Sequence, residues 1–69
     1  MMKYLLRDGK VEYSGNKQQI IDYINECYED DYWVQQYGKI FNKDFDKFLY
    51  TIQCLGLQLS NKMPKYRRR

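Results

Sequence analysis

The chain of 69 residues has no histidine, and its only serine or threonine hydroxyls belong to Ser14, Thr51 and Ser60. Nucleophilic catalysis of the Ser/His/Asp or Cys/His type needs a histidine base beside the nucleophile, so both arrangements are excluded. The segment 14–16 is too short for a phosphate-binding loop and lacks the glycine spacing of one. We therefore expect a protein that is not an enzyme and that uses no cofactor.

Cysteine is also scarce, because Cys27 and Cys54 are the only two and neither belongs to a C-x-x-C pair. With no histidine to complete a ligand set, no metal site is expected. The apolar run near the N-terminus is too short for a signal peptide, and no window reaches the roughly 18 apolar residues of a membrane span. These absences predict a cytoplasmic protein, without a membrane partner, whose thiols are free and mostly buried.

Alanine is absent, whereas eight residues are tyrosine and 43% of the chain is hydrophobic. This composition supports one small core, which predicts a single compact domain over residues 1–61. The bias toward Tyr, Lys, Ile and Asn is also typical of a low-GC coding sequence, such as that of a low-GC bacterium or its phages.

Charge divides the chain into two parts. Residues 1–61 carry seven basic and nine acidic side chains, a net charge of −2, whereas residues 62–69 carry five basic side chains and no acidic one. The overall charge of +3 is therefore a property of the C-terminal segment, which we expect to be a flexible basic tail.

Residues 3–13 are predicted to form a β-hairpin. Asp8-Gly9 lies between two short apolar runs and suits a type I′ turn, whose two central residues need positive φ. Arg7 should then pair with Lys10, and Leu5 should face away from the helices. The face that covers a helix would carry four side chains: Tyr4, Leu6, Val11 and Tyr13.

Two helices should follow the hairpin. The first runs from Lys17 to about Glu29, after a capping box made by Asn16 and Gln19. Its inner face would carry Ile20, Ile21, Ile24, Cys27 and Tyr28. The second, residues 32–37, should begin after the acidic caps at 30–31 and end at Gly38 in the left-handed conformation.

A third helix is predicted from Asn42 to about Leu59, capped by Asn42 or Asp44, with Gly56 as a point where it ends or bends. Its apolar stripe recurs at spacings of three and four and comprises Phe45, Phe48, Leu49, Ile52, Leu55 and Leu59. Residues 39–41 fit either a loop or a short strand. The predicted fold is α+β, a hairpin followed by three helices (ββααα).

An acidic and aromatic segment is the first candidate binding site. Five acids and no base lie between residues 22 and 31, and large aromatic rings follow directly. Acids beside aromatic anchors suit docking on a basic protein surface. The alternative is a solvated helix face beside core aromatics. The candidate partner-binding residues are Asp22, Glu26, Glu29, Asp30, Asp31, Tyr32 and Trp33.

Two further patterns suggest contacts. Tyr50, Cys54 and Leu57 form a minor stripe on the predicted third helix, which would be either covered within the domain or used for self-association, giving a monomer or a homodimer. The tail can bind phosphates and stack a base, although short basic ends often only aid solubility. The candidate nucleic-acid residues are Lys62, Lys65, Tyr66, Arg67, Arg68 and Arg69.

The functional hypothesis from the sequence is a non-enzymatic protein that binds a larger protein, such as a basic nucleic-acid-binding one, through the acidic and aromatic segment. A phage-encoded inhibitor or adaptor that blocks a host enzyme or nuclease fits this pattern. The alternative is a small nucleic-acid-associated regulator that uses its basic tail and is a dimer.

Overall fold

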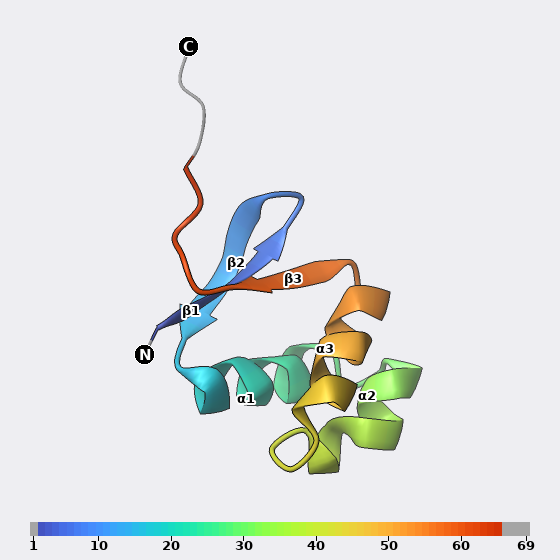
Figure 1. Ribbon diagram of the computed structural model, residues 1–69. Coiled ribbons are helices and arrows are strands. Elements are labelled where there is room, and N and C mark those ends of the chain that lie inside the picture. Colours follow the sequence, from blue (N-terminus) through green and yellow to red (C-terminus); the bar gives the residue numbers. More distant parts are fainter. Residues whose placement is uncertain (1, 66–69) are drawn as a thin grey trace.

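The computed structural model describes residues 2–65 and has a three-stranded antiparallel sheet beside three α-helices (Figure 1). The strand order is β2-β1-β3, so β1 is central. The α+β class and the predicted order ββααα are confirmed as far as the third helix, whereas the final strand was not predicted. The elements are β1 (Lys3–Arg7), β2 (Lys10–Gly15), α1 (Lys17–Cys27), α2 (Tyr32–Tyr37), the 3-10 helix η1 (Gly38–Ile40), α3 (Phe45–Cys54) and β3 (Leu57–Ser60).

The turn between β1 and β2 has the predicted geometry. Asp8 and Gly9 have φ values of 53° and 78°, as a type I′ turn requires. The two pairs next to the turn are Arg7 with Lys10 and Leu6 with Val11, as predicted. The local turn signal therefore sets the register where the hairpin begins.

Beyond these pairs the register shifts, and the predicted inner face of the hairpin is wrong. Glu12 is an extra residue in β2, so Leu5 pairs with Tyr13, whereas simple alternation from the turn predicts that Tyr4 pairs with Tyr13. A bulge of this kind lets two successive side chains oppose one residue of the partner strand. Leu5 is fully buried, whereas Tyr4 and Leu6 are only half-buried.

The first helix begins with the predicted capping box. The Gln19 amide donates to Asn16 Oδ1 at 2.8 Å, and the Asn16 amide donates to Gln19 Oε1 at 2.9 Å. The helix ends at Cys27, two residues before the predicted end at Glu29. Its three isoleucines are buried as expected, but Cys27 is exposed, so its prediction as an inner residue is wrong.

The second helix has the predicted bounds and cap, since Asp31 accepts from the Trp33 and Val34 amides. Gly38 is not left-handed, because its φ is −55°. Its lack of a side chain serves a close approach instead: the Asn25 side-chain amide donates to the Gly38 carbonyl at 3.3 Å, and a Cβ there would lie 2.2 Å from Asn25 Oδ1.

The chain between α2 and α3 is neither a strand nor an irregular loop. Residues 38–40 form η1, and Phe41 follows as a fully buried side chain. Asp44, not Asn42, caps α3, because its Oδ1 accepts from the Lys47 amide at 3.2 Å. This turn brings α3 back alongside α2.

The prediction that the third helix continues to Leu59 is wrong. It ends at Cys54, Gly56 adopts φ +80°, and residues 57–60 form β3, which pairs antiparallel with β1. Leu57 is buried and Leu59 is half-buried on this strand. The positive φ is a conformation that only glycine adopts readily, so Gly56 stops the helix and starts the strand.

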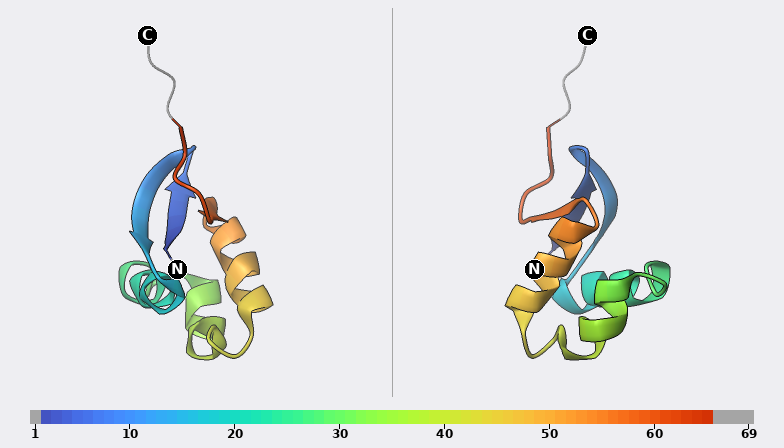
Figure 2. Two further views of the ribbon diagram at one scale, coloured as in Figure 1. Left: turned by 60° about the vertical axis from the view of Figure 1, so that its left-hand side comes forward. Right: turned by 90° about the vertical axis from the view of Figure 1, so that its right-hand side faces the viewer.

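The core lies between the sheet and the helices. In Figures 1 and 2 the strands lie at one end of the molecule and α2 at the other, and α3 extends between them. Leu49, predicted as part of the inner stripe of α3, is 36% exposed. The buried apolar side chains are Leu5, Ile20, Ile21, Ile24, Val34, Phe41, Phe48, Ile52 and Leu57.

Replacement of Gly56 tests the helix-to-strand junction. Gly56→Ala should lower the free energy of unfolding by about 1–2 kcal/mol, because an alanine at positive φ is strained. Gly56→Asn should lose less, since asparagine tolerates this region better. Urea unfolding measures both, and equal stability of the wild type and Gly56→Ala would contradict this assignment.

Candidate functional site

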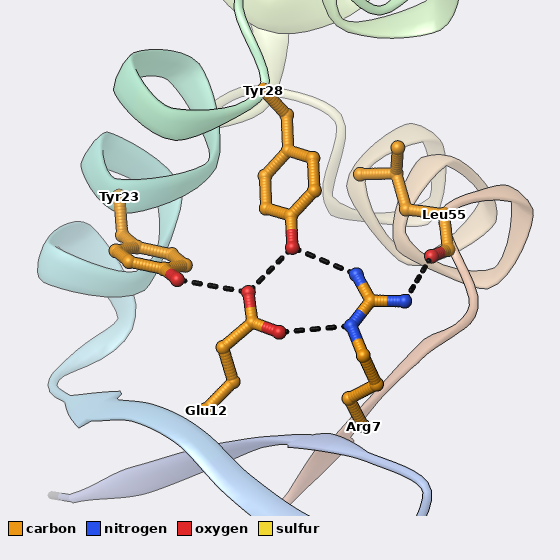
Figure 3. A network of polar contacts seen from close by, with 5 residues as sticks. All are labelled: Arg7, Glu12, Tyr23, Tyr28 and Leu55. Atoms are coloured by element: carbon orange, nitrogen blue, oxygen red, sulfur yellow. Dashed lines mark hydrogen bonds and ion pairs between the residues drawn. The ribbon is translucent and has the colours of Figure 1, made fainter.

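A polar network joins the sheet to two helices (Figure 3). Arg7 Nε donates to Glu12 Oε1 at 2.9 Å, its Nη1 donates to the Leu55 carbonyl at 3.0 Å, and its Nη2 donates to the Tyr28 hydroxyl at 2.7 Å. The second carboxylate oxygen of Glu12 accepts from the hydroxyls of Tyr23 at 2.8 Å and Tyr28 at 2.5 Å. The network therefore connects β1 and β2 to α1 and to the end of α3.

The ionisable groups of the network shift one another's pKa values. Partial burial alone would raise the pKa of Glu12, but hydrogen bonds from Tyr28, Arg7 and Tyr23 outweigh it and lower that pKa. Burial, followed by the hydrogen bonds to Glu12, raises the pKa of Tyr23 and of Tyr28. The network is thus stable with an ionised carboxylate and two neutral phenols.

This polar network acts as a structural joint. Both oxygens of Glu12 and all three donor atoms of Arg7 already have partners. The Tyr23 ring also stacks on Tyr13 at a centroid distance of 4.3 Å. The polar groups of the network thus engage one another and join the sheet to the helices.

Within residues 2–65, a group of four rings with two exposed members lies on α2 and α3. It is here called the aromatic surface and comprises Tyr32, Trp33, Tyr37 and Tyr50. Trp33 is its centre: ring centroids lie 5.0 Å away in Tyr32, 5.7 Å away in Tyr37 and 5.6 Å away in Tyr50. Tyr32 is 61% exposed and Tyr50 is 49% exposed. Rings from two helices thus form one continuous patch open to solvent.

A hollow of about 450 Å³ opens beside these rings, between α2 and the start of α3. Asp44 lines it while also capping α3, and the exposed Asp46 lines it from the first turn of that helix. Lys47 lies with its ammonium 4.6 Å from the centroid of the Tyr37 ring. The residues around the hollow are Trp33, Tyr37, Asp44, Asp46, Lys47 and Tyr50.

The structure brings together parts of two candidate sites that the sequence kept apart. Tyr32 and Trp33 came from the acidic segment and Tyr50 from the minor stripe of the third helix, and the Trp33 and Tyr50 rings are in contact. Cys54, one turn after Tyr50, is exposed, and a hydrogen bond with its side chain raises the pKa of the Tyr50 hydroxyl. Leu57 does not belong here, because it is buried on β3, and its assignment to a self-association stripe is corrected.

The acidic candidates differ in their surroundings. Asp31 is engaged as the cap of α2, and Asp22 accepts from the side chain of Gln18 at 2.9 Å. The side chains of Glu26, Glu29 and Asp30 are exposed. Glu29 and Asp30 directly precede α2, so they are continuous in sequence with the aromatic surface.

The two cysteines and the basic segment complete the set of candidates. Both thiols are free, as predicted, but both are exposed, so the prediction of buried thiols is wrong. Lys62 and Lys65 are exposed. The remaining nucleic-acid candidates lie outside the described residues: Tyr66, Arg67, Arg68 and Arg69.

Four residues of the hollow were missed as site residues by sequence reasoning. Tyr37 lies four residues after Trp33 on one helix, a spacing that puts two rings on the same face and that could have indicated it. Carboxylates are common at the start of a helix, where they cap exposed amides, so Asp44 and Asp46 did not indicate a site. No sequence pattern around Lys47 indicates one either. Only the packing of α2 against α3 reveals their shared position.

Two kinds of site are missing from the part of the chain that the structure describes. Residues 2–65 contain no cluster of three or more Cys, Asp or Glu side chains that could hold a metal ion. No helix in the same range is long and apolar enough to cross a membrane.

Acid unfolding tests the polar network. A lowered pKa of Glu12 means that its ionised form stabilises the fold at neutral pH, and that this stabilisation is lost as the pH falls below the ordinary value of 4.5 through the lowered one. Glu12→Gln should reduce the free energy of unfolding at neutral pH by about 1–3 kcal/mol. The difference in free energy of unfolding between Glu12→Gln and the wild type should narrow in acid, where the wild-type carboxylate is protonated. Glu26→Gln, at an exposed position, is the control, and a difference that stays constant with pH would contradict the role of the charge.

Comparison of the chain with models of protein families, with curated proteins and with solved structures finds no match. The hollow and the aromatic surface around it are therefore the observations from which a function can be inferred.

Proposed function

We propose that this is a non-enzymatic binding protein that attaches to a larger protein through the aromatic surface of α2 and α3. The observation that carries the proposal is the contact of Trp33 with rings on both helices while Tyr32 and Tyr50 remain about half exposed or more. Tyrosine and tryptophan bury a large area at low entropic cost, and they are enriched among the residues that dominate binding energy.

The charges beside the rings favour a protein partner with a basic surface. Asp44 and Asp46 line the hollow, and the exposed side chains of Glu29 and Asp30 precede α2. Carboxylates at the edge of an aromatic patch steer a basic partner toward it and discriminate against an acidic one. Nucleic-acid phosphates would be repelled by the same carboxylates, so the aromatic surface suits protein better than nucleic acid.

A mode of action follows from the same features. A chain of this size without a histidine and without a phosphate-binding loop is suited to act by covering a surface of its partner. This is how an inhibitor or adaptor works, including a phage-encoded one directed at a host enzyme or nuclease. Its composition is compatible with such a source.

Affinity capture with matched variants tests the proposal. The purified chain is immobilised and exposed to a nuclease-treated lysate of a low-GC bacterium, and retained proteins are identified and titrated against the chain. Tyr32→Ser with Tyr50→Ser should weaken binding of the retained partner by about 30-fold or more, since a single aromatic anchor contributes on the order of 2 kcal/mol. The fold should persist, because neither side chain is part of the core.

The control removes exposed apolar side chains elsewhere. Met2→Ser with Met63→Ser, both positions more than half exposed, should leave capture unchanged. Equal retention by all three proteins would refute the proposed surface. Retention from an untreated lysate that is absent with the nuclease-treated lysate would instead support nucleic-acid binding.

A further inference from the structure

We propose that the hollow beside Trp33 and Tyr50 is a receptor for an arginine side chain of the partner protein. This inference rests on the proposed function and names the chemical group that the aromatic surface recognises. Three observations support it: the arrangement of the rings, the position of a cation that the chain itself places in the hollow, and an acid there without a partner.

The rings present their faces in more than one direction. Trp33 is nearly perpendicular to Tyr50, with an interplanar angle of 85°, and nearly parallel to Tyr37, with an angle of 5°. Because the face of an aromatic ring carries negative electrostatic potential, a cation is attracted to any ring face that is open to the hollow. Rings whose faces point in different directions therefore offer a positively charged group more than one approach.

The chain already demonstrates this interaction at one ring. The ammonium of Lys47 lies 4.6 Å from the centroid of Tyr37, within the distance over which a cation is attracted by a ring face. This lysine occupies the Tyr37 end of the hollow. Trp33 and Tyr50 line it as well, and Tyr50 is 49% exposed.

An unpaired carboxylate supplies the charge for a second cation. Asp46 lines the hollow and, within residues 2–65, its side chain makes no hydrogen bond or ion pair. Asp44 adds a second negative charge, although one of its oxygens accepts from the Lys47 amide. With Lys47 included, the lining carries two negative charges and one positive charge, so one further cation would balance it.

Arginine fits this combination better than lysine does. Its planar guanidinium stacks on an aromatic face while its N–H groups donate in pairs to a carboxylate. An ammonium is more strongly hydrated and makes no such paired contact. A volume of about 450 Å³ accommodates the side chain together with water. The occupant is thus an arginine from a basic surface of the partner.

Fluorescence of Trp33 provides a direct test, because it is the only tryptophan of the chain. The full-length protein is titrated into the millimolar range with a capped glycine-serine peptide that contains several arginines. Matched peptides carry lysine or the neutral analogue citrulline at the same positions. We expect a saturable change in Trp33 emission with the arginine peptide, binding at least about fivefold weaker with lysine, and no saturation with citrulline.

Two charge variants connect the signal to the hollow. Asp46→Asn should weaken the arginine peptide about five- to tenfold and reduce the dependence of its affinity on salt, because one charge pair is lost. Asp8→Asn removes the same charge from the hairpin turn, where asparagine also suits positive φ, and should leave binding unchanged. Unfolding curves of both variants confirm that the fold is retained.

Several results would overturn the inference. Equal binding of the arginine and citrulline peptides, equal effects of the two charge variants, or no saturable change would each do so. A change of Trp33 emission with protein concentration alone would show that a second copy, not a partner, occupies the hollow. If arginine binding fails while capture still depends on Tyr32 and Tyr50, the proposed function stands and only this inference is lost.

Discussion

The contact of Arg7 with Glu12 is the interaction on which the arrangement of the elements depends. Arg7 lies on the central strand, and its three donors reach the neighbouring strand, the end of α1 and the carbonyl that closes α3. One side chain thus links the sheet to both long helices. The polar network lies where β1 and β2 meet α1 and the end of α3, whereas the aromatic surface lies where α2 packs against α3, at the end of the molecule away from the strands (Figure 1).

Local signals in the sequence predicted what local physics controls. Asp8-Gly9, the capping box at Asn16 and the cap at Asp31 each depend on residues within four positions, and all three have the predicted geometry. The bulge at Glu12 could not be predicted in this way, because the carboxylate there contacts two tyrosines that lie more than ten residues away in the sequence. Simple alternation along the hairpin therefore gave the wrong face.

The third strand shows a second limit of sequence reasoning. Leu55 and Leu59 are four residues apart, as on one helix face, whereas Leu57 and Leu59 are two apart, as on one strand face. Periodicity over so short a segment fits both structures. Two features favour the strand: the edge of β1 with which it pairs, and the positive φ of Gly56. The pairing with β1 is a tertiary property, whereas the conformation of Gly56 is local. The sequence predicts that the helix ends or bends at Gly56, but it does not predict the strand that follows.

At the candidate site, too, local signals identify single residues, whereas tertiary packing brings them together. Tyrosine occurs in two different settings in this molecule. Tyr23 and Tyr28 have their hydroxyls bound to Glu12, whereas Tyr32 and Tyr50 expose their rings around Trp33. The sequence identified Trp33 and Tyr50 separately, but their contact depends on how η1 and the cap at Asp44 return the chain.

This separation has a physical consequence for recognition. The phenols of the polar network stabilise the fold through hydrogen bonds that a substitution would break, so they cannot change freely to suit a ligand. Within the aromatic surface, Tyr37 packs against the core and the other three rings lie outside it, and none of the four belongs to the polar network. Substitutions of Tyr32 and Tyr50 should therefore leave the network unchanged, and their effects on the free energy of unfolding should add to those of substitutions in the network, because distant sites that share no partners act independently.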